Sequence, residues 1–483
     1  MASQTELKNK AQLAEAAQTL AHSYELIQLG ATTYIPVNWE TEAPQPTTDG
    51  ETIWIPLTKV DKLQLANVKS QILFSTDSEF RSFDFMLRQV ARRIEFTPTS
   101  ILVKTENGIR ELAEDGQLYP HNGNFTPNYI RPMLNEDEDD KKFVFDTIAE
   151  WVNSEEEAIS LLRHIATALA PHYAAVKYIL FIGDGRNGKG VLLTMLNELF
   201  GSSNVSNVQR QMISERRSTV GELNGKLLNI VFDGPMTYIR DSSAEKTLTA
   251  GEPLDIELKY ENVPLRVQTN ALFVEALNTE PKNRDKTPAL QKRLVRFKFP
   301  NIYAQDKAFL RKMTSERYLG ALLSLLIDHY VREDELAGKL ALTAGSIELQ
   351  LEQVFLGSPV LQFLDTLTES PDALKKLEEG KMFVDDFISS FKPWMESQGF
   401  PERSDAALLE MVTASFQIGW KTRRDPQKKN KPTSKRCIQA IKPETLLALE
   451  QLKGVSDGTE PSDEELVGDG SLPKQHTDTG ADQ

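Results

Sequence analysis

Cysteine, histidine and long apolar runs are all scarce in this chain of 483 residues. The single cysteine, Cys437, excludes a disulfide within the chain and any zinc site built on several thiolates. The six histidines are scattered without ligand spacing, so His164 and His172 favour structural or exposed positions over metal binding. No apolar run reaches the length of a membrane span, and the first residues lack a signal-peptide pattern. These absences predict a cytoplasmic protein without a membrane partner.

Basic residues are also in deficit, with 55 Lys and Arg against 70 Asp and Glu and a net charge of −15. The acids are concentrated in the run 136–140 and in the tail beyond residue 450. We expect the run 136–140 to be a loop or linker, and residues 451–483 to be disordered because they are acidic and nearly free of aromatics. Since the acids are clustered, local basic surfaces remain, and the net charge does not exclude a nucleic-acid partner.

Length and an apolar content of 40% allow about three domains with sizeable cores. Strand and helix patterns alternate between residues 176 and 300, which predicts an α/β domain with a mainly parallel sheet. Asn-Gly and Asp-Gly pairs at 107–108 and 115–116 predict a hairpin over 101–120. The expected segments are a mixed α+β region (1–142), a helical collar (143–172), the α/β core (173–304), a helical extension (305–357), a mostly helical C-terminal domain (358–450) and the acidic tail (451–483).

A glycine-rich loop is the most informative feature that is present. Residues 183–190 read Gly-Asp-Gly-Arg-Asn-Gly-Lys-Gly, after an apolar strand at 178–182 and before a helix expected over 191–200. Such a loop wraps its backbone N–H groups around a polyphosphate, and the helix N-terminus faces the same anion. The predicted phosphate-binding residues are Gly183, Asp184, Gly185, Arg186, Asn187, Gly188, Lys189, Gly190 and Val191.

Gly190 departs from the usual pattern, which has Ser or Thr after the lysine as a ligand of Mg²⁺. The loop therefore predicts a nucleoside triphosphate site of variant form. The alternative is an ordinary tight turn between a strand and a helix.

Three polar residues at strand ends could complete such a site; the strands are expected at 226–233, 270–278 and 291–300. Asp233 ends the first strand, where a carboxylate can hold Mg²⁺. Asn278 ends the second and can hold the attacking water and the γ-phosphate. Arg293 begins the third and suits an arginine finger. Each residue alone could be a cap, a turn or a surface residue, and Gly234 stands where a second acid would orient the water.

In combination, these elements resemble the superfamily 3 helicases, specifically the phage and poxvirus-type primase–helicases. The segments that carry the resemblance are 183–189, 248–255, 276–281, 292–294 and 299–300. The resemblance implies an AAA+ P-loop motor that uses ATP and Mg²⁺, forms a hexameric ring and moves along DNA, usually 3′ to 5′. It also implies that Arg293 acts on the nucleotide of a neighbouring subunit. A phage protein of this kind would work in the bacterial host cytoplasm, beside a separate primase or polymerase.

Two basic segments could contact DNA. The first is a hairpin before the strand at 270–278, where Lys259, Tyr260 and Arg266 offer phosphate contacts and a stacking surface; the alternative is a solvated hairpin tip. The second is the stretch 421–436. Poxvirus-type relatives carry a winged-helix domain after the motor, and a basic wing would fit this stretch. The alternative is a basic loop paired with the acidic tail. Its predicted DNA-binding residues are Lys421, Arg423, Arg424, Lys428 and Lys429.

The sequence therefore predicts an ATP-dependent DNA helicase that unwinds duplex DNA during phage or plasmid replication. One alternative is a primase–helicase with an unrecognised N-terminal priming site, although the nearest candidate, residues 82–86, holds a single acid. The other is a replication initiator or DNA-binding protein that uses ATP only as an assembly switch.

Overall fold

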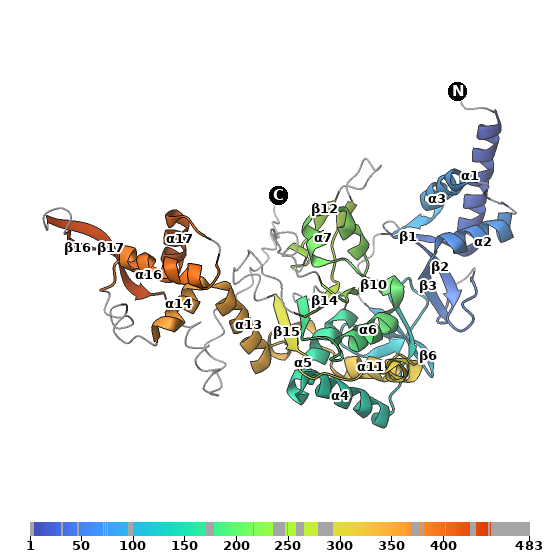
Figure 1. Cartoon of the computed structure of the whole chain (residues 1–483). Coiled ribbons are helices and arrows are strands. Elements are labelled where there is room, and N and C mark those ends of the chain that lie inside the picture. Colours follow the sequence, from blue (N-terminus) through green and yellow to red (C-terminus); the bar gives the residue numbers. More distant parts are fainter. Residues whose placement is uncertain are drawn as a thin grey trace, which may run out of the picture. The chain divides into compact units, whose positions relative to one another are not determined.

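The chain folds into two compact units, Met1–Ser346 and Ile347–Gln483, each described by itself (Figure 1). The computed structural model describes residues 4–29, 32–45, 48–70, 72, 74, 76–94, 100–170, 178–215, 217–234, 247–248, 250–256, 265–278, 293–368, 377, 381–400, 402–425, 431–442 and 445. Both units mix helices and strands, which confirms the α/β prediction. The boundaries expected at 142, 172 and 304 fall inside the first unit.

The N-terminal part of the first unit is a four-stranded sheet packed with three helices. The sheet order is β3-β2-β1-β4, and side chains such as Leu20, Ile35, Ile53 and Phe83 share one buried core. A capping box at Thr76 and Glu79 starts the third helix. The elements are α1 (Gln4–Tyr24), β1 (Ile27–Leu29), β2 (Thr32–Asn38), β3 (Thr52–Pro56), α2 (Lys59–Ser70), α3 (Asp77–Val90) and β4 (Arg92–Arg93).

A second four-stranded sheet, in the order β7-β6-β5-β8, confirms the predicted hairpin. Gly108 and Gly116 have φ angles of 91° and 79°, a left-handed conformation that glycine adopts without steric cost. The strands are β5 (Ile101–Thr105), β6 (Gly108–Leu112), β7 (Leu118–Pro120) and β8 (Tyr129–Met133).

The third sheet is five-stranded, and every neighbouring pair in it is parallel, as predicted. Its order is β10-β11-β14-β9-β15, so β9 lies between β14 and β15. Its inner strands are buried on both faces, which explains their nearly continuous apolar sequences. The strands are β9 (Tyr178–Ile182), β10 (Val205–Ser206), β11 (Leu228–Val231), β14 (Leu272–Leu277) and β15 (Leu294–Lys298).

Helices share a core with each face of this sheet. Residues of α4, α5, α6 and α11 pack in one cluster with Ile179, Val274 and Val295, whereas α7 and η2 pack in another with Tyr178 and Phe273. The helices of the first cluster are α4 (Glu138–Val152), α5 (Glu155–Ala166), α6 (Lys189–Asn204) and α11 (Glu316–Asp328), and those of the second are α7 (Arg210–Glu215) and η2 (Arg217–Leu223). The shorter helices that follow are η1 (Thr167–Leu169), α10 (Lys307–Met313), η3 (Glu333–Glu335) and α12 (Leu336–Lys339).

The expectation of a loop or linker at 136–140 is wrong for its last three residues, which form the first turn of α4. Asp137 caps the helix by accepting a bond from the backbone N–H of Asp140 at 3.0 Å. The buried carboxylate of Asp140 accepts from Arg317 Nε at 2.6 Å, and this bond holds the pKa of Asp140 below its usual value. Acids at a helix N-terminus interact favourably with the helix dipole, so an acidic run can begin a helix as readily as form a linker.

The second unit is mostly helical, as predicted, and ends in a long hairpin. Phe363, Phe387 and Phe391 form the aromatic centre of its core, with ring centroids 5.3 to 5.7 Å apart. An isolated bridge joins Phe383 to Cys437 in the hairpin. The elements are α14 (Pro359–Thr368), α16 (Val384–Ser397), α17 (Asp405–Ser415), β16 (Phe416–Asp425) and β17 (Lys431–Ile441), and α13 (Ala344–Gly357) spans the boundary between the units.

Candidate nucleotide-binding site

The carboxyl ends of β9, β14 and β11 lie side by side, and three of the predicted site residues follow these strands. Gly183 follows β9, and its N–H donates to the carbonyl of Leu277 in β14 at 3.2 Å. Asn278 follows β14, and Asp233 comes two residues after the end of β11; both are exposed. Ligands of open α/β sheets bind at this edge, so the three residues lie where a nucleotide would be expected.

The glycine-rich loop, residues 183–190, joins β9 to α6 through unusual backbone conformations. Gly188 caps the helix with a φ of 95°, and Arg186 also has a positive φ of 65°. A Cβ atom at position 188 would lie 2.5 Å from Cγ of Trp151 in α4, so only glycine fits there. Asp184, Gly185 and Arg186 are exposed. The loop therefore presents its tip to solvent while its two ends are fixed.

Lys189 is only 6% exposed and is folded against its own loop. Its Nζ donates to the carbonyl oxygens of Gly183 and, at 3.4 Å, Asp184, and to Oδ1 of Asn187 at 3.1 Å. Burial lowers the pKa of Lys189 below its usual value. Phosphate oxygens would be charge-assisted acceptors, stronger than these neutral oxygens, so the geometry suits a lysine that turns to an anion.

The segment after β15 holds the loop in place. The N–H of Phe299 donates to Ile182 at 2.8 Å, and its carbonyl accepts from Nδ2 of Asn187 at 3.0 Å. The N–H of Tyr303 donates to the carbonyl of Arg186 at 2.7 Å. These bonds fix both ends of the loop to one neighbouring segment, which preorganises its backbone N–H groups.

The residues at this edge fit Mg²⁺ through one carboxylate. Gly190 has no hydroxyl, and the hydroxyl of Thr194 donates to the carbonyl of Gly190 at 2.7 Å. No cluster of three or more His, Cys, Asp or Glu that could hold a metal ion occurs among the described residues. Mg²⁺ is commonly held by one or two carboxylates together with substrate phosphates and waters, so Asp233 alone can serve beside a nucleotide.

Glu275 is a buried acid beside this edge that belongs to none of the sequence motifs. It lies in β14 and is 2% exposed, and its Oε2 accepts from the hydroxyl of Tyr178 at 3.2 Å. A Cβ atom at Gly234 would overlap the Glu275 carboxylate, lying 2.7 Å from Cδ. A carboxylate thus packs beneath the residue after Asp233, where the motif would have its second acid. The available signal was a glutamate within an otherwise apolar strand.

Arg293 does not join the other site residues of its own chain. Its carbonyl accepts from the N–H of Tyr178, the first residue of β9, at 2.6 Å. Arg293 therefore lies at the amino edge of the sheet, one strand length from Gly183, or about 16 Å for five residues. Any action of Arg293 on a nucleotide bound at the carboxyl edge must come from another subunit.

The predicted DNA-binding residues are only partly described. Lys259 and Tyr260 lie outside the described residues, as do Lys428 and Lys429. The flanks of the predicted first hairpin, β12 (Leu254–Ile256) and β13 (Leu265–Val267), pair antiparallel, with Arg266 opposite Asp255. Lys421, Arg423 and Arg424 lie on β16, opposite Lys435, Thr433 and Pro432 of β17.

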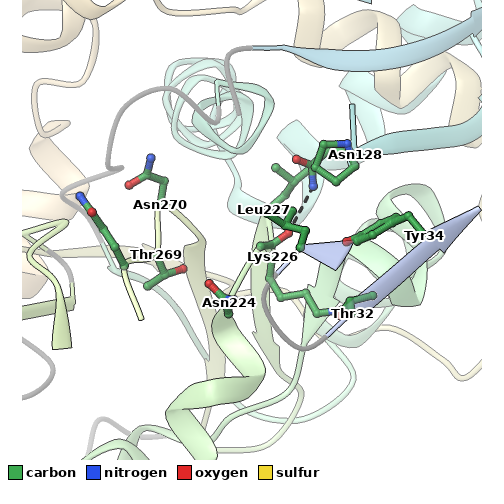
Figure 2. A pocket seen from close by; sticks show the side chains of 12 residues that line it. Thr32, Tyr34, Asn128, Asn224, Lys226, Leu227, Thr269 and Asn270 are labelled. Atoms are coloured by element: carbon green, nitrogen blue, oxygen red, sulfur yellow. Dashed lines mark hydrogen bonds between the residues drawn. The ribbon is translucent and has the colours of Figure 1, made fainter. Parts of the chain in front are cut away.

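A small cavity of about 120 Å³ lies at the other edge of the sheet (Figure 2). Its lining includes Asn128 before β8, Asn224 before β11 and Asn270 before β14. Nζ of Lys226 donates to the carbonyls of Ser202 and Ser203 at the end of α6, so this cation stabilises the helix C-terminus. The cavity is thus separate from the glycine-rich loop.

Comparisons with known proteins give the following similarities. Residues 181–293 match the model of a family described as a family of unknown function (DUF5906). The solved "A form apo structure of NrS-1 C terminal region-CTR" is 12% identical in sequence and has a TM-score of 0.49. The match covers 88% of this chain and 98% of the chain in that structure. "The apo structure of NrS-1 C terminal region (305-718)" is also 12% identical, covers 90% and 99%, and has a TM-score of 0.46. Identities and scores at this level carry no argument about activity.

No curated protein matches the chain. Within the described part of the chain, no helix is both long and apolar enough to cross a membrane. The family match spans the glycine-rich loop, Asp233, Asn278 and Arg293, so the four predicted catalytic residues belong to one matched segment.

The packing of Gly234 over Glu275 predicts a measurable coupling. Gly234→Ala should lower the free energy of unfolding by about 1–3 kcal/mol, because the new methyl group overlaps a buried carboxylate. In a Glu275→Ala background the same change should cost at least about 1 kcal/mol less. Urea unfolding of the four proteins of this cycle measures both values. Gly190→Ala is the matched control, since nothing lies within 4 Å of a Cβ there; additive costs at 234 and 275 would contradict the contact.

Proposed function

We propose that the chain is an ATP-dependent DNA helicase of superfamily 3, an AAA+ motor that unwinds duplex DNA during phage or plasmid replication. The observation that carries the proposal is the juxtaposition of the glycine-rich loop, Asp233 and Asn278 at one edge of a parallel sheet. Hexameric assembly and 3′ to 5′ movement follow from the helicase resemblance, and they are part of the proposal.

The order of the central sheet supports this class of motor. β14 is inserted between β9, which precedes the loop, and β11, which precedes Asp233. A P-loop motor needs its phosphate-binding loop and its metal-binding acid at one edge of the sheet, and this order provides both with room for one polar residue between them. The inserted strand places Asn278 between the phosphates and the metal-binding carboxylate.

In the proposed reaction, the loop N–H groups and Lys189 bind the β- and γ-phosphates of ATP. Asp233 would hold Mg²⁺, and the bound ion would supply positive charge that stabilises the charge developing on the phosphates. Asn278 positions the attacking water with a neutral amide and adds no negative charge next to the γ-phosphate. The side chains thus contribute positioning and electrostatic stabilisation, which is where most of the catalysis of phosphoryl transfer comes from.

The position of Arg293 supports a ring. Because Arg293 lies at the amino edge of the sheet, it can complete a site only on a neighbouring subunit. An interface that joins two different surfaces of one protein closes into a ring when its rotation allows. A guanidinium supplied in this way would stabilise charge on the transferring phosphoryl group.

A second candidate is an initiator that uses ATP as an assembly switch without processive unwinding. The absence of a hydroxyl at Gly190 and of an acid at Gly234 favours this candidate, because both groups normally assist hydrolysis. Strand displacement separates the two candidates: a protein that hydrolyses ATP but displaces no strand from substrates with 3′ or 5′ overhangs would be the initiator.

Lys189→Ala should lower DNA-stimulated ATP hydrolysis at least about 100-fold, the scale for losing one transition-state donor. The measurement is phosphate release with and without DNA. Lys226→Ala is a suitable control, because this lysine is also partly buried but bonds the end of α6. Wild-type protein that shows no DNA-stimulated hydrolysis, or hydrolysis that survives Lys189→Ala, would contradict the motor.

Sharing of sites between subunits predicts complementation. Arg293→Ala and Lys189→Ala proteins should each be inactive, but mixing them should restore part of the hydrolysis, because some interfaces then combine an intact lysine with an intact arginine. Phosphate release at several mixing ratios is the measurement. No recovery at any ratio, despite exchange of subunits, would argue against an arginine finger at this position.

Gly190→Ser should make the protein bind Mg²⁺ more tightly. The position is open, so a serine side chain fits, and its hydroxyl would supply the ligand that the motif normally provides. We expect half-maximal hydrolysis at a lower Mg²⁺ concentration than in the wild type, and Gly190→Ala should leave that concentration unchanged. Equal behaviour of the Ser and Ala variants would show that the metal does not approach residue 190.

A further inference from the structure

The hairpin β16–β17 carries an exposed tryptophan, Trp420. Its side chain is 68% exposed, the highest value among the large aromatic side chains that the structure describes. An indole has one of the largest apolar surfaces of any side chain, and its flat face can stack on a nucleic-acid base.

Trp420 lies on β16 just beyond the part of the hairpin that packs against the helices of the second unit. Ile418 and Ile438 lie opposite each other on β16 and β17, and both pack in the core with α16 and α17. Trp420 is two residues further along β16, on the same face, and pairs with Arg436. Figure 1 shows the hairpin extending outward from α16 and α17. Trp420 is thus the first residue of its face beyond the core.

The two strands are strongly basic around this ring. They contain six basic residues and one acid, Asp425. Arg436 and Lys421 are exposed, and Lys435 makes one ion pair, to Asp385 at 3.1 Å between two partly exposed side chains. The basic residues of the strands are Lys421, Arg423, Arg424, Lys431, Lys435 and Arg436.

The preceding helix has the opposite character. α17 has no Lys or Arg, and its charged residues are the exposed acids Asp405 and Glu410. In helix-turn-helix readers, a helix in this place enters the major groove between two rows of phosphates. Acidic side chains oppose that approach, so among the described residues of the second unit the basic hairpin suits an anion better than α17 does.

We propose that the hairpin β16–β17 binds the unpaired strand of DNA, with Trp420 stacking on an exposed base and Arg436, opposite it on the same face, binding the neighbouring phosphate, while α17 stays outside the groove. The inference rests on the proposed function only in taking DNA as the partner. Unpaired DNA is favoured over an intact duplex because stacking needs a free base face, which a duplex hides except at its ends.

The acidic tail is a weaker occupant for this surface. Residues 451–483 contain no Phe, Tyr or Trp, so the tail offers charge for the arginines and lysines but no flat ring for the indole. Single-stranded DNA offers both phosphates for the basic side chains and bases for the indole ring. The tail remains one outcome of the test.

Binding to labelled oligonucleotides tests the proposal on the full chain, with Lys189→Ala in every protein so that motor activity plays no part. Trp420→Ala should weaken binding to single-stranded DNA about 5- to 100-fold, the range for losing one base–aromatic stack. Trp420→Phe should retain most of the affinity. Phe85→Ala removes an equally exposed aromatic from the first unit and should change nothing.

Salt and substrate dependence give independent readouts. Arg436→Ala should lower the slope of log affinity against log salt by about 0.7, the value for one phosphate contact on a single strand, whereas Lys421→Ala, on the opposite face of β16, should lower it less. Glu410→Ala should leave both affinity and slope unchanged. A long blunt duplex, in which base faces are exposed only at the two ends, should bind the Trp420→Ala protein and its parent alike.

Three results would overturn the proposal. They are unchanged single-strand binding in Trp420→Ala, an equal loss on blunt duplex, and a Trp420 effect that vanishes when residues 451–483 are deleted, which would assign the ring to the tail. If only the proposed motor function is wrong, the result would be different. Protein with Lys189 intact would then hydrolyse no ATP, while Trp420→Ala would still weaken binding to single-stranded DNA.

Discussion

The parallel pairing of β9 with a strand on each side is the constraint on which the site depends. Parallel strands end at the same edge, so the register that pairs Ile182 with Leu277 also brings the residues after both strands together. The backbone bonds of Gly183 to Leu277 and of Phe299 to Ile182 continue this pairing into the loop. The glycine-rich loop thus has rigid supports on both sides, and its conformation is a continuation of the sheet.

Close packing decides which residues the site tolerates. Gly188 lies against Trp151, and Gly234 lies against Glu275, so two of the glycines are fixed by neighbours more than by phosphate chemistry. The buried Lys189 is held by oxygens of its own loop, which limits the cost of placing a cation in a poorly solvated position. The structure thus keeps this cation beside the glycine-rich loop in a restrained conformation.

Local sequence patterns predicted much of this arrangement but could not supply its long-range part. The strand, loop and helix around residues 178–200 have strong local signals, and the structure confirms all three. The place of Arg293 at the amino edge follows from its position at the start of a strand in a parallel sheet, but the insertion of β14 between β9 and β11 is contained in no local pattern. The role of Glu275 depends on its contact with Gly234, which is distant in the sequence. An acidic run such as 136–140 predicts a linker or a helix N-terminus equally well, because both favour the same acids.

The strand β9 links two predicted site elements, one at each of its ends. Its first residue bonds the backbone of Arg293, and its last residue leads into the glycine-rich loop. In a ring of the proposed kind, one short rod would then connect two successive nucleotides, its own and that of the neighbour. A shift of β9 on hydrolysis would withdraw Arg293 from the nucleotide of the neighbouring subunit or insert it there. In the proposed ring, this linkage would give successive hydrolysis events a direction without any separate signalling element.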